Sequence, residues 1–163
     1  KICKTTSSLK KIKPVKTKKS KISIAIALDN SFNFYYHDNI QALRREGAKI
    51  KFFSPISDKK IPNCDLIYLG GGFPEILASS LEKNSSMKKS IKNNAEDGTP
   101  IYAECGGLMY LTNSITYGHK KSKMVGLFDV DTVMTKKMTL NYTEGKINSN
   151  CLISKPTSKF VNS

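Results

Sequence analysis

Residues 101–111 read Ile101-Tyr102-Ala103-Glu104-Cys105-Gly106-Gly107-Leu108-Met109-Tyr110-Leu111. The first three residues predict a short buried strand and residues 108–111 predict a helix, so Cys105 falls on the turn between them. Gly106 and Gly107 remove side chains that would clash in a sharp turn. A strand, turn and helix in this order are typical of a nucleophile elbow, in which the turn exposes a reactive side chain.

Apolar strands and amphipathic helices precede this unit. Strands are predicted at residues 22–28, 50–53 and 66–69, and helices at 38–46, from Pro74 onward, and from Ser85 or Ser86 to Asp97. This alternation predicts an α/β fold with a mostly parallel sheet covered on both faces. After Lys123 the pattern changes to short strands at 125–128, 130–134, 138–142 and 151–153, which predict a C-terminal antiparallel extension.

The first 21 residues are rich in Lys, Ser and Thr and predict a basic linker, followed by one domain over residues 22–163. The net charge is +14 and comes mainly from lysine. We expect no nucleic-acid partner, because no aromatic residues are interleaved with the basic arm and no nucleic-acid-binding module is visible. A lysine-rich proteome, or a surface that attracts a polyanionic substrate, remain alternative explanations of the charge.

The location and the thiol chemistry follow from what the sequence lacks. No stretch approaches the roughly 20 apolar residues that span a membrane, and no apolar run follows the basic N-terminus as in a secretory signal. The four cysteines are Cys3, Cys64, Cys105 and Cys151, without a C-x-x-C pair or a histidine at metal-ligand spacing. We therefore expect a cytoplasmic protein with free thiols, no metal site and no membrane partner.

Two loops follow predicted strands at the edge where parallel α/β sheets bind ligands. The first carries Cys105, and the N–H of Gly106 beside it is placed to donate to an oxyanion. The second is Gly70-Gly71-Gly72, which leaves backbone N–H groups exposed ahead of Pro74. The alternatives are a small buried hydrophobic residue at Cys105 and a plain tight turn at the glycines.

The chain resembles the C-terminal glutamine amidotransferase domain of the cobyrinic acid a,c-diamide synthase family, which includes hydrogenobyrinic acid and nickel-sirohydrochlorin a,c-diamide synthases. Four segments carry the resemblance, in family order: Ile24 to Ala27 leading to Phe32-Asn33-Phe34-Tyr35-Tyr36-His37-Asp38-Asn39; Phe52-Phe53-Ser54-Pro55; Tyr68 to Glu75; and Ile101 to Leu111. The aromatic residues of the first segment are open to two interpretations: a contribution to the glutamine pocket or to the contact between domains, or simple packing.

The resemblance implies a class I glutamine amidotransferase (flavodoxin-like) sandwich and a glutamine-dependent carbon–nitrogen ligase. Cys105 would form a thioester with glutamine and release ammonia, while Gly71, Gly72 and Gly106 would bind glutamine or its oxyanion. The partners implied are glutamine and, through an N-terminal domain that uses ATP and magnesium, a tetrapyrrole polycarboxylate such as cobyrinate. No cofactor is expected within these residues, and a homodimer is one assembly to consider.

A histidine base is also implied by the resemblance, from a Gly-His-Glu-x-His-like motif after the antiparallel strands. The sequence offers His37 and His119, both of which we interpret as solvated surface residues. We therefore expect a domain truncated at both ends that hydrolyses no glutamine by itself. The alternatives are an amidotransferase-like binding module without catalysis, and the related cobyric acid synthase or cell-wall amidotransferases, against which the Asn33-Phe34-Tyr35-Tyr36 motif argues.

Overall fold

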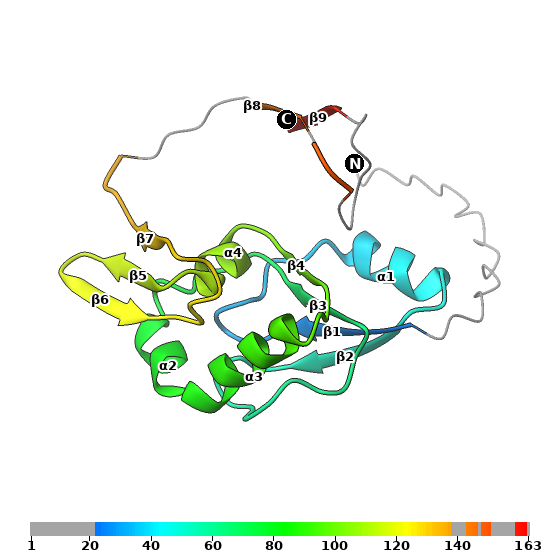
Figure 1. Ribbon diagram of the computed structural model, residues 1–163, viewed down its shortest axis with the longest axis horizontal. Helices are drawn as coiled ribbons and strands as arrows, with labels where there is room; N and C mark the ends of the chain where they lie inside the picture. Colours follow the sequence, from blue (N-terminus) through cyan, green and yellow to red (C-terminus); the bar gives the residue numbers. More distant parts are fainter. Residues whose placement is uncertain (1–21, 138–142, 147, 151–158, 163) are drawn as a thin grey trace, which may run out of the picture.

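The computed structural model describes residues 22–137, 143–146, 148–150 and 159–162 (Figure 1). Its centre is a parallel sheet in the order β2-β1-β3-β4. The strands are β1 (Ser23–Ala27), β2 (Lys49–Phe53), β3 (Leu66–Leu69) and β4 (Ile101–Ala103). All three pairings are parallel, so the carboxyl ends of the four strands meet at one edge.

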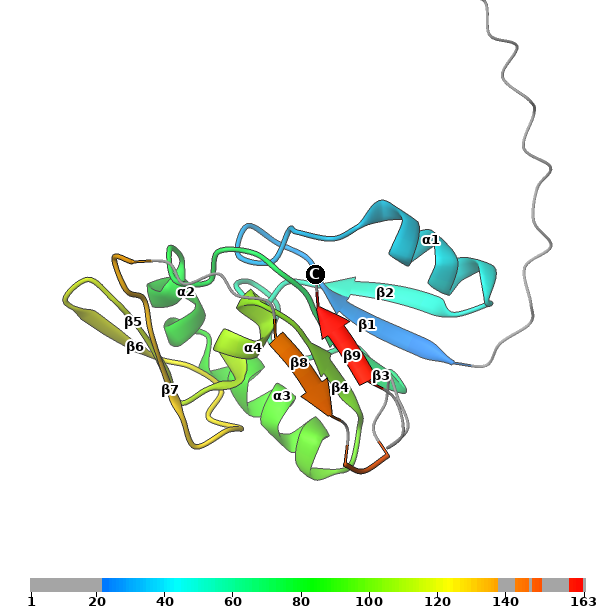
Figure 2. The ribbon, with the colours of Figure 1, turned by 90° about the horizontal axis from the view of Figure 1, so that it is seen from above.

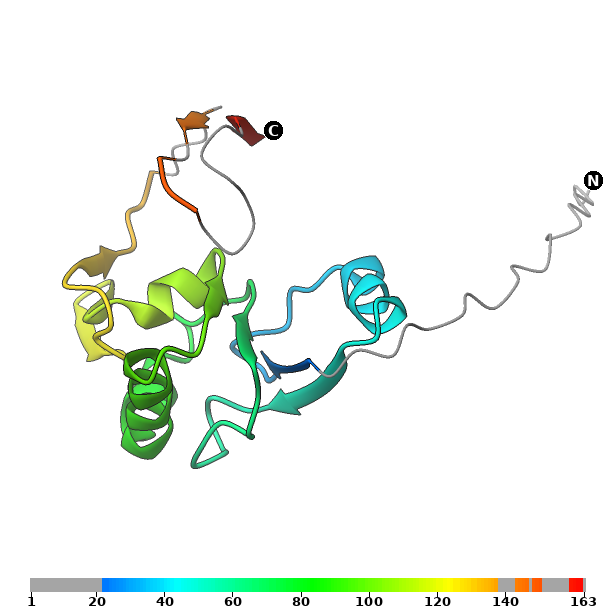
Figure 3. The same cartoon turned by 45° about the vertical axis from the view of Figure 1, so that its right-hand side comes forward.

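Helices cover both faces of this sheet. Alternate residues of β1 point to opposite faces, so Ala25 and Ala27 join a different core cluster from Ile24 and Ile26. On one face lies α1 (His37–Arg45), and on the other lie α2 (Ala78–Lys83) and α3 (Ser85–Glu96) (Figure 3). The Asn84 side chain caps α3 by accepting a hydrogen bond from Met87 N at 3.3 Å.

The chain continues from β4 through α4 (Gly106–Leu111) into a second, smaller sheet. That sheet has the order β6-β5-β7, with strands β5 (Ser114–Tyr117), β6 (Lys120–Lys123) and β7 (Asp131–Val133). It lies at the opposite end of the molecule from α1 (Figure 2). Two further strands, β8 (Thr143–Lys146) and β9 (Lys159–Asn162), pair with each other in antiparallel orientation.

The predicted α/β fold with a mostly parallel sheet is confirmed, and so is a C-terminal extension that contains antiparallel pairs. Within the extension β7 departs from the expectation, because it runs parallel to β5. The strand predicted at residues 125–128 is wrong, since this segment lies outside any strand and contacts the end of α4 through hydrogen bonds. The predicted strands at 138–142 and 151–153 lie outside the described residues.

Two other boundaries differ from the prediction. The helix expected from Pro74 begins only at Ala78, after a turn in which Ile76 N donates to Phe73 O at 3.2 Å. The β5–β6 hairpin was not predicted. Its strands are joined by the two-residue turn Gly118-His119, and in β6 only Ser122 is buried.

Candidate functional site at the carboxyl edge of the parallel sheet

Three loops meet where the parallel strands end. They follow β1, β3 and β4, and they run through residues 28–36, 70–77 and 104–105. The parallel pairing of the three strands brings the loops to one edge, above which α4 begins (Figures 1 and 3). Both sequence features expected to carry chemistry, Cys105 and the glycine run, therefore lie at the same edge.

Cys105 forms the sharp turn between β4 and α4. Its backbone has φ 50° and ψ −117°. Within the described part of the chain, Cys105 is the only residue other than glycine that has a positive φ. Such a conformation costs about 1–3 kcal/mol and persists where the surroundings hold it in place. The Cys105 side chain is exposed, whereas the other described cysteine, Cys64, is half-buried. The turn thus has the geometry of a nucleophile elbow, with its thiol presented to solvent.

The two glycines after Cys105 allow a close approach between loops. A Cβ atom on Gly107 would lie 2.1 Å from the carbonyl oxygen of Leu69, and one on Gly106 would lie 2.8 Å from Pro74 Cδ. Gly107 N also donates to Gly70 O at 2.9 Å. A side chain at either position would push the β3 and β4 loops apart.

The glycine run packs against the loop that follows β1. A Cβ atom on Gly72 would lie 2.0 Å from Ser31 O, and one on Gly70 would lie 2.3 Å from Cε1 of Tyr35. Phe34 N donates to Gly71 O at 3.1 Å, which makes an isolated antiparallel bridge between the two loops. The glycines are therefore required for packing as well as for any binding of a ligand.

Gly72 and Gly106 present neighbouring backbones. The carbonyl oxygen of Gly72 lies 3.1 Å from the position of a Cβ on Gly106. Within the described residues, neither the Gly72 N–H nor the Gly106 N–H donates a hydrogen bond, while Gly107 and Met109 N–H groups both have acceptors. The two glycine backbones thus come together next to Cys105, whose side chain is exposed.

Some aromatic side chains of the segment after β1 pack in the core, and others lie on the surface. Phe32 is fully buried, with its ring 5.4 Å from that of Tyr110. The Tyr35 hydroxyl donates to Ala27 O and accepts from Gly70 N at 3.0 Å, and burial raises its pKa to about 12. Phe34 and Tyr36 are 62% and 68% exposed beside the glycine run. The packing interpretation therefore holds for Phe32 and Tyr35, and the contribution of Phe34 and Tyr36 to a pocket or a domain contact stays a prediction.

A carboxylate directly before Cys105 was not singled out by the sequence. Glu104 accepts hydrogen bonds from the Tyr68 hydroxyl at 2.6 Å and from the Tyr102 hydroxyl at 3.3 Å. Burial, together with the hydrogen bond to Glu104, raises the pKa of Tyr68 above its usual range. The recognisable pattern is a tyrosine at the same place in two predicted neighbouring strands, with an acidic residue two positions after the second.

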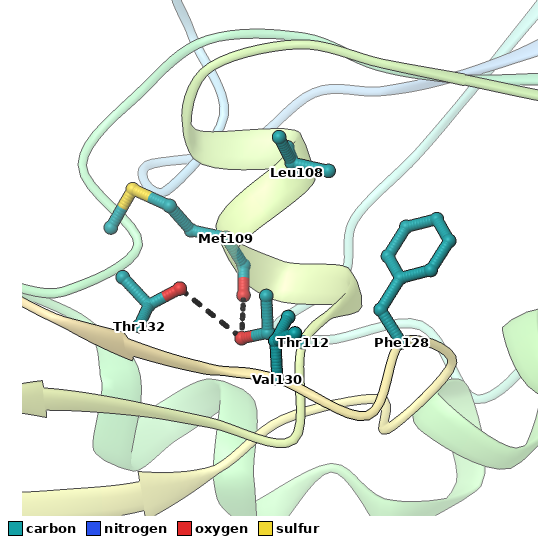
Figure 4. Close-up of a pocket in the computed structure, with 6 residues that line it drawn as sticks. All are labelled: Leu108, Met109, Thr112, Phe128, Val130 and Thr132. Atoms are coloured by element: carbon teal, nitrogen blue, oxygen red, sulfur yellow. Dashed lines mark hydrogen bonds between the residues drawn. The ribbon is translucent and has the colours of Figure 1, made fainter.

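An apolar hollow of about 480 Å³ lies beside α4, and Glu104 is not among the residues that line it. Figure 4 shows its lining, which comes from α4 and the segment leading to β7: Leu108, Met109, Thr112, Phe128, Val130 and Thr132. Thr112 Oγ1 donates to Met109 O at 2.7 Å and lies 3.3 Å from Thr132 Oγ1. None of the described residues that line the hollow has an ionisable side chain.

The two histidines lie in other elements than the turn that carries Cys105. His37 begins α1, is exposed, and has its Nε2 atom 3.3 Å from Nε2 of Gln41. His119 is in the turn of the β5–β6 hairpin, which points away from the parallel sheet (Figure 1). Within the described residues neither histidine forms a hydrogen bond with Cys105.

Two kinds of feature are missing from the described residues. No helix there is both long and apolar enough to cross a membrane. Among the same residues, no three His, Cys, Asp or Glu side chains gather as a metal site would require.

Comparison with known proteins gives consistent matches. The family profile of the CobB/CobQ-like glutamine amidotransferase domain matches residues 23–160. A Methanococcus vannielii protein named cobyrinate a,c-diamide synthase is 53% identical, and the match covers 89% of this chain and 31% of that protein. A Methanosarcina acetivorans protein of the same name is 45% identical, and the match covers 84% of this chain and 30% of that protein. A third, from Listeria innocua, is 50% identical and covers 73% and 26%. The chain thus spans about a third of the length of these curated relatives.

A solved structure shares the fold. The crystal structure of a Listeria monocytogenes protein assigned to the peptidase E group matches with a TM-score of 0.54 and 16% identity. The match covers 71% of this chain and 67% of that chain. At this identity the likeness concerns the arrangement of helices and strands, which is that of the class I glutamine amidotransferase fold.

Proposed function

The chain belongs to the CobB/CobQ-like glutamine amidotransferase domain family, and we propose that it is the glutamine-hydrolysing domain of a cobyrinate a,c-diamide synthase. The observation that carries the proposal is the exposed thiol of Cys105 on a turn with positive φ, next to the place where the Gly72 and Gly106 backbones come together. The names of relatives from three genera support the choice of this synthase within the family.

The proposed reaction begins with Cys105. After its thiol proton leaves to a base, the sulfur attacks the side-chain amide carbon of glutamine and a C–S bond forms. The N–H groups of Gly72 and Gly106 donate to the oxyanion, and Gly71 between the loops forms part of the pocket wall. The C–N bond then breaks and ammonia leaves with an added proton. Water attacks the resulting thioester, the C–S bond breaks, and glutamate and the thiol are released.

The base in this scheme is proposed to be a histidine other than His37 and His119. Both of these are exposed and neither contacts the thiol. A base must come within about 2.6–3.2 Å of the proton that it takes, directly or through one water. A position in the turn of a hairpin outside the parallel sheet gives His119 no route to that distance.

The ammonia is proposed to amidate the a and c acetate groups of a tetrapyrrole in another domain of the longer protein. That domain would use ATP and magnesium to activate the carboxylates, since amide formation from a free carboxylate and ammonia needs an activated acyl group. The ring and its metal would be chosen there, so cobyrinate and nickel-sirohydrochlorin are both compatible with this domain.

Labelling with a diazo-ketone analogue of glutamine tests the proposal. The full-length protein is incubated with the analogue, digested and mapped by mass spectrometry, with and without excess glutamine. We expect one adduct, at Cys105, that glutamine suppresses and that Cys105→Ala abolishes. Cys64 is the internal control, because burial raises the pKa of its thiol and lowers its reactivity. An adduct at Cys64, or one at Cys105 that glutamine does not suppress, contradicts the proposal.

A further inference from the structure

We propose that Glu104 is a positioning residue, which holds the Cys105 turn in its reactive conformation through hydrogen bonds to Tyr68 and Tyr102. The three residues are called the tyrosine–glutamate clamp below. The inference rests on the proposed function, in which Cys105 is the nucleophile, and it adds a residue that makes no contact with glutamine.

The clamp joins two adjacent strands to the turn. Tyr68 in β3 and Tyr102 in β4 are directly paired in the parallel register, and their ring centroids lie 5.1 Å apart. One carboxylate oxygen of Glu104 accepts from Tyr68 at 2.6 Å, and the other accepts from Tyr102 at 3.3 Å. Hydrogen bonds to an ionised acceptor are the stronger kind, so the carboxylate fixes its own residue against both strands.

The backbone of Glu104 is held as firmly as its side chain. Its N–H donates to Leu69 O at 3.1 Å, and its carbonyl oxygen accepts from Gly107 N at 2.9 Å. Glu104 is therefore bound at four places and directly precedes Cys105, whose backbone has a positive φ. A strained residue needs surroundings that determine its conformation from several directions, and the clamp provides one of them.

A third tyrosine extends the clamp to the glycine run. The Tyr35 ring lies 5.3 Å from that of Tyr68 with an interplanar angle of 81°, and the Tyr35 hydroxyl accepts from Gly70 N at 3.0 Å. The same aromatic layer thus contacts both loops that carry the proposed oxyanion donors. A displacement of Glu104 would change the relation of Cys105 to Gly72 as well as its own geometry.

A carboxylate is a costly choice for packing alone. Glu104 is half-buried, and it faces an open hollow of about 540 Å³ that it shares with Leu43, Leu66 and the two tyrosines. Burial of a charge is unfavourable unless the charge is paired through hydrogen bonds. An apolar side chain would cover the tyrosines at lower cost but would leave their hydroxyls and the turn without a common anchor.

The test compares Glu104→Ala, Glu104→Gln and Tyr68→Phe in the full-length protein, with Tyr117→Phe, an exposed tyrosine of β5, as the matched control. We expect Glu104→Ala to lower kcat for glutamine hydrolysis by about 10–100-fold with KM changed less than about 3-fold, because small displacements of a reacting group cost rates of this order. Synthesis with free ammonia should be unchanged. Glu104→Gln should recover most of the rate, since an amide still bonds the tyrosines, and Tyr68→Phe should lower the rate about 3–10-fold.

Several results would overturn the clamp. Equal rates for Glu104→Ala and the control would show that Glu104 is dispensable. Equal loss of rate for Glu104→Gln and Glu104→Ala would show that the effect comes from the negative charge and not from the hydrogen bonds to the tyrosines. Equal loss with glutamine and ammonia would indicate damage to the fold. If Cys105→Ala hydrolyses glutamine as well as the wild type, the proposed function fails instead. In that case crystal structures still test the clamp independently. The clamp requires that φ of Cys105 is near 50° in the wild type and that this angle changes in Glu104→Ala.

Discussion

At the scale of single residues, Gly72 and Gly106 each meet two requirements, one of packing and one of the proposed catalysis. Their missing side chains allow the loops to pack, since a Cβ on Gly72 would lie 2.0 Å from Ser31 O and one on Gly106 2.8 Å from Pro74 Cδ. Their N–H groups are the proposed donors to the oxyanion. A side chain at either position would push the neighbouring loop away and would move the backbone N–H group of the glycine as well.

We predict that Gly72→Ala and Gly106→Ala lower glutamine-dependent synthesis by about 10²–10³-fold, the usual effect of losing one oxyanion donor. Synthesis with free ammonia should be nearly unaffected, because ammonia bypasses the thioester. Steady-state rates with the two nitrogen sources give the comparison. Gly118→Asn is the control: its φ of 60° suits Asn, and no atom lies within 4 Å of its Cβ position. A parallel loss with both nitrogen sources would mean that the substitutions had harmed the fold.

At the scale of elements, the parallel sheet is held at its amino end by a carboxylate. Asp65 Oδ2, just before β3, accepts from Ser23 N at 2.7 Å and from Ser23 Oγ at 2.9 Å, at the start of β1. These hydrogen bonds lower the pKa of Asp65 below its usual value. A lowered pKa means that the stabilisation is present above the ordinary Asp pKa of about 3.9 and is lost as the pH falls through the lower, folded-state value.

We predict that Asp65→Asn lowers Tm at pH 7, and that the difference from wild type shrinks as the pH falls below the ordinary Asp pKa of about 3.9. Thermal unfolding followed by circular dichroism across this range measures the effect. The control is Asp97→Asn, because the exposed Asp97 side chain accepts no hydrogen bond in the described part of the chain. A difference that stayed constant over the whole pH range would exclude the carboxylate as its source.

The elements show where local sequence determines structure and where it does not. The unit at residues 101–111 was predictable because an apolar strand, two glycines and an apolar helical stretch follow one another directly in the sequence. The strand β6 was not, since Lys120–Lys123 has no apolar residue and becomes a strand through pairing with β5. Residues 125–128 are apolar but bond to the end of α4, which no local pattern reveals. Likewise the hydrogen bond from Tyr68 to Glu104 depends on the pairing of β3 with β4, whereas Tyr102 is only two residues from Glu104.

At the scale of the whole molecule, positive charge is in large excess. The net charge is +14, and the ion pair between Lys121 and Asp131 is exposed, with its nitrogen and oxygen 2.8 Å apart. Exposed pairs contribute at most about 1 kcal/mol. Repulsion among like charges therefore opposes the compact state, and dissolved salt should weaken that repulsion.

We predict that Tm rises by a few degrees when sodium chloride is raised from about 10 mM to about 300 mM, because the Debye length falls below about 10 Å. Differential scanning fluorimetry at matched pH measures the shift. A variant with Lys59→Glu and Lys60→Glu, both exposed between β2 and β3, should respond less to salt. A Tm that falls with salt would show that attraction between charges outweighs repulsion.

The positive φ of Cys105 has a consequence for how such a domain can be improved or degraded by mutation. Glycine adopts this backbone conformation at little cost, so Cys105→Gly relieves the roughly 1–3 kcal/mol of strain, less the extra entropy that glycine has in the unfolded chain. The inactive protein would thus be at least as robust as the active one. A laboratory selection for heat resistance alone would tend to discard the thiol, and a lineage freed from the need for glutamine would lose this residue without a penalty in folding.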